Sequence, residues 1–137
     1  MDRPENVVYA VIMLWTALAI YLLSFVCSVL DPANPYHFPE SLPWNAYCLA
    51  TFVIMALLIF KIRAGANWAR IICVLLQIGF CLVEGLTWAV ASLFHNSAMD
   101  ALAVLRVIAA LILPWPTAIL LFSKSANAWF KAERKAS

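Results

Sequence analysis

Residues 71–94 read IICVLLQIGFCLVEGLTWAVASLF, and Glu84 is the single charged side chain in this run. A helix needs about 20 mostly apolar residues to cross a bilayer core of about 30 Å, so the run is long enough to span a membrane. Three more such runs occur, at about 7–30, 44–62 and 101–122. They do not alternate in polarity, which favours helices over a β-barrel. The sequence therefore predicts an all-α fold: a polytopic membrane protein folded as an antiparallel bundle of four transmembrane helices.

The composition of the 137-residue chain points to the same class of protein. Hydrophobic residues make up 66% of the chain and charged residues 12%, and the mean hydropathy is +0.92. A water-soluble domain of this size could not bury so much apolar surface, and disordered chains lack it. The net charge is only +2, so we expect no nucleic-acid partner. We predict one transmembrane domain over residues 1–137, with residues 123–137 as a tail.

The basic residues are unevenly distributed between the predicted loops. The loops at 31–43 and 95–100 contain no Lys or Arg. Eight of the nine basic residues lie near the N-terminus, between the second and third runs, or in the tail: Arg3, Lys61, Arg63, Arg70, Lys124, Lys131, Arg134 and Lys135. Because cytoplasmic loops carry the excess of Lys and Arg, both termini are predicted to be cytoplasmic. The first run is longer than the apolar core of a signal peptide, so we expect it to remain as a helix of a multi-pass protein.

The tail combines Trp129 and Phe130 with basic residues. Such a segment forms either a short helix on the inner membrane surface or a solvated tail after the last span. The sequence leaves both alternatives open.

Polar residues gather along one face of the third run. They recur at steps of three and four residues, the spacing of one helix face: Cys73, Gln77, Cys81, Glu84, Thr87 and Trp88. Glu84 is expected near the bilayer midplane, where a charge costs a few kcal/mol unless it has a partner or is protonated. Arg106, in the fourth run, is the predicted partner. Trp115 lies between Pro114 and Pro116, which are expected to bend or break the fourth helix near the depth of Glu84.

Two interpretations of these residues stay open. In the structural one, Glu84 and Arg106 form a buried pair that fixes helix packing. In the functional one, Glu84 binds a cation, a proton or a polar ligand. The candidate intramembrane binding site comprises Glu84, Arg106, Gln77, Thr87, Trp88 and Trp115.

The remaining reactive residues do not form a catalytic or metal-binding pattern. The four cysteines include no Cys-x-x-Cys pair, although a disulfide between Cys27 and Cys48 is geometrically conceivable. The polar loop residues do not have the spacing of a known metal motif: His37, Glu40, His95 and Asp100. The chain also lacks a nucleophile–base pair and a phosphate-binding loop. We therefore expect no metal, no cofactor and no enzymatic activity.

The loop between the second and third runs, residues 61–70, reads KIRAGANWAR. Gly65 permits a tight turn, and Asn67 is expected to cap the third helix. Trp68 is predicted to anchor at the membrane interface and Arg70 to meet anionic headgroups.

This loop, with RPENVV at the start of the chain and LLFSKSANAWF at its end, resembles a loosely defined group of small four-span bacterial inner-membrane proteins. These share a Gly-x-Asn-Trp-Ala-Arg turn and a Trp-Phe tail. The resemblance implies a location in the cell inner (plasma) membrane and a topology, but no activity.

The function that these patterns favour is interaction with a membrane partner, as an accessory subunit or an immunity-type protein that neutralises a membrane-targeting toxin. The expected partners are the lipid bilayer and a membrane protein or further copies of the chain. The alternative is a small oligomeric proton-coupled transporter or channel that uses Glu84.

Overall fold

The structure is a computed structural model that describes residues 3–30, 42–94, 108 and 111–136. The side chains of Trp44 and of residues 84–94 and 134–136 lie outside this description. Within the described residues the fold has five helices and no strands, which confirms the predicted all-α class. The helices are α1 (Glu5–Leu30), α2 (Leu42–Arg63), α3 (Asn67–Phe94), α5 (Pro114–Leu121) and α6 (Lys124–Ala136).

Two of these helices are long and apolar enough to cross a membrane. They are α1 and the Asn45–Arg63 part of α2. The Asn67–Val83 part of α3 is apolar but shorter. Residues 101–107 and 109–110 of the predicted fourth span fall outside the described residues. Its described end contains α5, which begins at Pro114 as the expected helix break requires.

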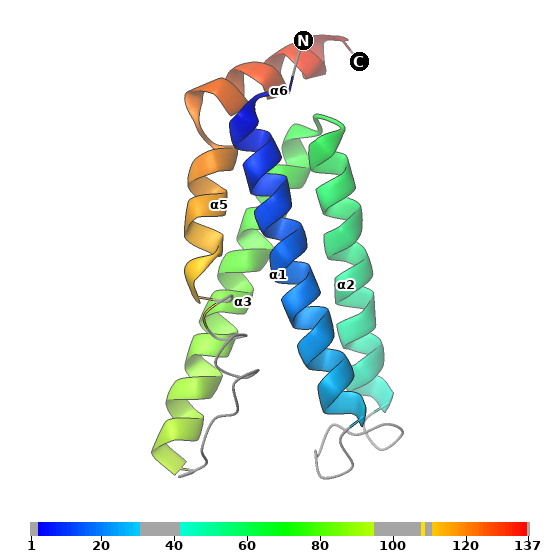
Figure 1. The fold of residues 1–137 in the computed structure, drawn as a ribbon, viewed down its shortest axis with the longest axis vertical. Coiled ribbons are helices and arrows are strands. Elements are labelled where there is room, and N and C mark those ends of the chain that lie inside the picture. Colours follow the sequence, from blue (N-terminus) through cyan, green and yellow to red (C-terminus); the bar gives the residue numbers. More distant parts are fainter. Residues whose placement is uncertain (1–2, 31–41, 95–107, 109–110, 137) are drawn as a thin grey trace.

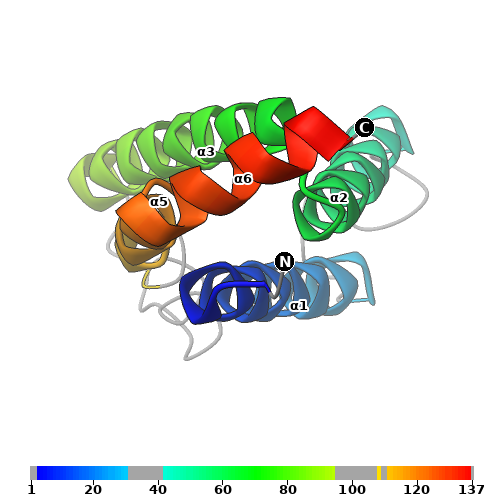
Figure 2. The same ribbon diagram turned by 90° about the horizontal axis from the view of Figure 1, so that it is seen from above.

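The helices α1, α2, α3 and α5 are arranged in a ring (Figure 2). Both α1 and α3 pack against α2 and against α5, and within the described residues α1 and α3 do not contact each other. Helix α6 lies across one end of the ring, beside the start of α1 and the α2–α3 turn (Figure 1). It contacts α1, α3 and α5, and we refer to this end of the molecule as the capped end.

Most buried apolar side chains lie at the capped end. They come from the start of α1, the end of α2, the start of α3, the end of α5 and the inner face of α6: Val7, Ala10, Val11, Leu14, Met55, Leu58, Ile59, Ile62, Ala69, Cys73, Val74, Leu121, Ala126, Trp129 and Phe130. Farther along α1 and α3, the buried residues are small or polar, namely Ala17, Ser24 and Gln77. Apolar packing therefore holds the ring together mainly beneath α6.

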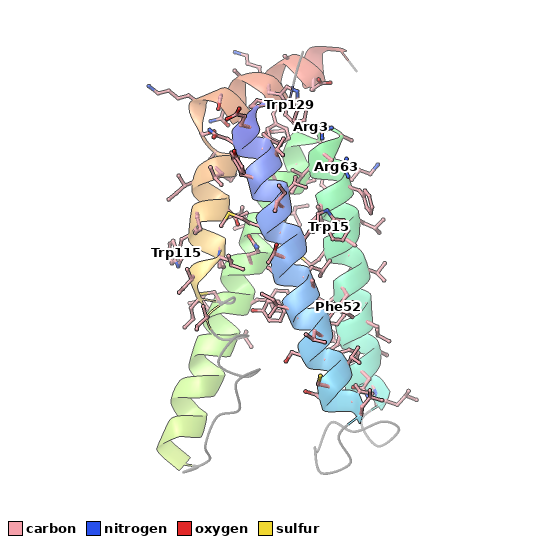
Figure 3. All side chains as sticks on the ribbon, viewed as in Figure 1. Arg3, Trp15, Phe52, Arg63, Trp115 and Trp129 are labelled. Carbon is pink, nitrogen blue, oxygen red and sulfur yellow. The ribbon has the colours of Figure 1, made fainter. Side chains whose placement is uncertain are left out.

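Two aromatic pairs hold α1 against α2 along its length. Trp15 meets Phe60, and Phe25 meets Phe52, each edge to face with ring centroids 5.5 Å apart. Figure 3 labels one residue of each pair, Trp15 in α1 and Phe52 in α2. Such pairs contribute about 0.5–1.5 kcal/mol beyond the apolar area that they bury.

The turn between α2 and α3 is a glycine-terminated helix end. The amide of Gly65 donates to the carbonyl of Ile62, and that of Ala66 to the carbonyl of Lys61, both at 3.0 Å. This pair of bonds is the Schellman motif, and it places Gly65 at φ +82°. A Cβ atom at Gly65 would lie 2.9 Å from Cβ and 3.0 Å from Cγ of Glu133 in α6. Glycine is thus required here both by the backbone conformation and by the approach of α6.

We predict that Gly65→Ala destabilises the protein by about 1–3 kcal/mol, because a left-handed conformation is costly for alanine and the new methyl group meets Glu133. Thermal unfolding in detergent, followed by tryptophan fluorescence, measures the effect. Gly79→Ala is the matched control, since its Cβ would meet no atom within 4 Å. An equal melting temperature for the two variants would contradict the assigned role of the turn.

Candidate functional site

The centre of the capped end is the buried side chain of Arg70, in the first turn of α3. It is 8% exposed, and its Nη1 donates a hydrogen bond to the carbonyl of Leu121, at 3.0 Å. The guanidinium carbon lies 4.8 Å from the ring centre of Phe122 and 4.5 Å from that of Phe130. A cation at the last carbonyls of α5 also opposes the negative end of that helix. Arg70 therefore joins α3 to the junction of α5 and α6.

Arg70 is buried, whereas the expected contact with anionic headgroups suggested an exposed side chain. The side chain turns inward because its guanidinium stacks on aromatic faces and reaches an otherwise unpaired helix-end carbonyl. Burial lowers the pKa of the Arg70 guanidinium from its usual value. An arginine nevertheless remains protonated in proteins, so the site contains a permanent buried cation.

The junction between α5 and α6 is held by side-chain hydrogen bonds. Ser123 precedes α6, and its Oγ accepts the amide of Ala126 at 3.4 Å, as a helix N-cap does. The Ser123 hydroxyl donates to the carbonyl of Leu120, and Nδ2 of Asn127 donates to the carbonyl of Phe122, both at 2.9 Å. These bonds pair backbone carbonyls at the end of α5 and a backbone amide at the start of α6.

Asn6, at the start of α1, fixes the same junction from the opposite end of the chain. Its Nδ2 lies 3.0 Å from Oγ of Ser123 and 3.0 Å from Oγ of Ser125. Sequence reasoning did not select Asn6, since an asparagine near a helix start indicates only a local cap.

The tail forms a helix, as one of the two alternatives considered for it predicts, and the inner face of this helix packs on the protein. Trp129 and Phe130 are buried on the inner face of α6. Their rings pack edge to face, with centroids 4.8 Å apart. The guanidinium of Arg3 lies 5.9 Å from the ring centre of Trp129 (Figure 3). The apolar face of α6 therefore covers the ends of the other helices.

The other residues of the predicted turn lie around this site. Gly65 forms the turn. Asn67 is the first residue of α3, so Ala66 and not Asn67 holds the position before the helix. Trp68 is 53% exposed, and its anchoring at a membrane interface stays a prediction.

The described part of the predicted intramembrane site is Gln77 and Trp115. Gln77 is 7% exposed, and within the described part of the chain its Oε1 has no hydrogen-bond partner. Trp115 is 63% exposed on α5, so the structure does not bring its ring into a buried site with Gln77. Glu84, Thr87 and Trp88 belong to α3, but their side chains lie outside the described part, as does all of Arg106.

The cysteines are all free: Cys27, Cys48, Cys73 and Cys81. The described residues contain no group of three or more His, Cys, Asp or Glu side chains that could hold a metal ion. The loop residues considered for metal binding lie outside the described part: His37, Glu40, His95 and Asp100.

Comparisons with protein-family models, with curated proteins and with solved structures gave no significant match. The resemblance to small bacterial inner-membrane proteins therefore stays a prediction from the motifs.

We predict that Arg70→Lys lowers the free energy of unfolding by about 1–3 kcal/mol. Lysine keeps the buried charge but loses the planar group that stacks between Phe122 and Phe130 and reaches the carbonyl of Leu121. The measurements are thermal unfolding in detergent and the rate at which trypsin removes the tail.

Arg63→Lys is the control, because Arg63 is exposed and its substitution should change stability by less than about 0.5 kcal/mol. If the two variants are equally stable and equally resistant to trypsin, Arg70 does not hold α6 in place.

Proposed function

We propose that the chain is a four-span protein of the bacterial inner membrane that acts by lateral contact with a membrane protein, as an accessory subunit or an immunity-type protein. The observation that supports this proposal is that the polar contacts lie at the capped end, whereas the sides of the ring are apolar. The hydrogen bonds at the capped end join helix ends to one another, whereas α1 and α2 expose large apolar side chains along their outer faces, such as Ile12, Leu23, Val53 and Leu57. A rigid ring with apolar sides fits a partner within the bilayer.

The proposed orientation places the capped end in the cytoplasm. It is supported by the exposed cations near α6 and the α2–α3 turn: Arg3, Lys61, Arg63, Lys124 and Lys131. The opposite end of the ring, where α2 begins at Leu42, follows a loop without Lys or Arg.

This orientation predicts the labelling of two single cysteines in a variant without the native ones. Ala128→Cys, on the exposed side of α6, should react with a membrane-impermeant maleimide only in inverted vesicles. Leu42→Cys, at the other end of the ring, should react only in spheroplasts, and labelling of both positions from one side would contradict the topology.

The partner hypothesis predicts that a pull-down from native membranes in mild detergent, analysed by mass spectrometry, recovers one membrane protein in a fixed ratio. Glu84→Gln should retain this partner, because the contacts are proposed to lie on the outer apolar faces. A homo-oligomer without any other protein would contradict this function.

The second candidate is the transporter or channel that uses Glu84, and Gln77 is the observation that favours it. Its buried Oε1 lacks a partner among the described residues, and Glu84 follows seven residues later in α3, on the same face of the helix. This alternative requires a proton flux in proteoliposomes that Glu84→Gln abolishes and Glu5→Gln leaves unchanged, since Glu5 is exposed at the start of α1.

A further inference from the structure

The buried charge of Arg70 is only partly compensated. The described residues provide one carbonyl, that of Leu121, and two aromatic faces. Among them no carboxylate pairs with Arg70, and its Nε is buried without a hydrogen-bond partner. A buried charge is costly unless it is paired and hydrogen-bonded. The Nε group of Arg70 therefore needs a further hydrogen-bond acceptor.

A second buried donor without an acceptor lies beside the same ring. Trp129 is 4% exposed, and its Nε1 has no hydrogen-bond partner among the residues that the structure describes. Phe130 contacts the ring of Trp129, with centroids 4.8 Å apart, and lies under the guanidinium of Arg70. The guanidinium of Arg70 and the ring of Trp129 therefore both contact Phe130, and each carries one buried N–H group without a partner among the described residues.

The surrounding charges favour an anion at this place. Arg3 lies over the face of Trp129, and Lys61, Arg63, Lys124 and Lys131 are exposed at the same end. The carboxylates described near the capped end are Glu5, which is exposed, and Glu133, whose Cβ and Cγ face Gly65. A phosphate group offers several acceptor oxygens and is well matched to arginine and to neutral N–H donors.

We propose that the capped end binds a phosphate group beneath α6, through Nε of Arg70 and Nε1 of Trp129, with Arg3 as an exposed third contact. This site is independent of the proposed protein partner. The group comes either from the headgroup of an anionic phospholipid or from free phosphate, since both present the same oxygens to the site.

The test uses the full chain, purified in detergent and stripped of lipid. Three probes are titrated separately: short-chain phosphatidylglycerol, diacylglycerol with the same chains, and inorganic phosphate. Binding is followed by the rise in melting temperature and by the mass of the complex in native mass spectrometry. Saturable binding of phosphatidylglycerol alone identifies a lipid headgroup site, and saturable binding of inorganic phosphate identifies a site for the free anion.

Trp129→Phe is the decisive variant, because it removes the N–H donor and keeps an aromatic ring. It should weaken binding of the phosphate-containing probe by about tenfold, the value of one lost hydrogen bond to a charged group. Arg63→Gln removes an exposed charge nearby and should leave the affinity within about twofold.

Arg70→Lys should weaken binding at least as much as Trp129→Phe, because it removes Nε and keeps the charge. The melting temperature of each variant without probe shows whether it is folded. The proposal is overturned if neither phosphate probe binds, if diacylglycerol binds as tightly as phosphatidylglycerol, or if Trp129→Phe binds like the unmodified chain.

Discussion

The contact between Arg70 and the end of α5 is the interaction on which the capped end depends. One guanidinium donates to the carbonyl of Leu121 and stacks on Phe122 and Phe130, so α3, α5 and α6 meet at a single side chain. Apolar packing brings the helices together, but it does not specify which way α6 turns after α5. The guanidinium of Arg70 fixes the direction of α6, because it donates to the carbonyl of Leu121 and stacks on two rings at the same time.

Hydropathy alone was sufficient to predict the long helices. The apolar runs at 7–30, 44–62 and 71–94 correspond to α1, α2 and α3, and the helix break at Pro114 is also where proline chemistry requires it. Gly65 was predicted as a turn residue, and its positive φ confirms that part of the prediction. These features are local, because each follows from residues that are neighbours in the sequence.

Contacts between distant parts of the chain could not be predicted in this way. An amphipathic segment such as 124–136 has the same pattern whether its apolar face meets lipid or protein, so the docking of α6 was not predictable from its residues. The same holds for Arg70, since a basic residue at a helix start suits both an exposed and a buried position. The pattern of polar residues in α3 indicated Gln77, which is buried, but could not show that Trp115 points away from it.

The bonds from Asn6 to Ser123 and Ser125 also set an order of events during synthesis. They join residues separated by 117 and 119 positions, so the capped end stays incomplete until nearly all of the described chain has been made. At about 5–20 residues per second, α1 exists for several seconds before its partners at the other end of the chain appear. During that interval α1 and α3 are held only by their packing against α2. The arrival of α5 closes the ring, and the arrival of α6 completes the capped end.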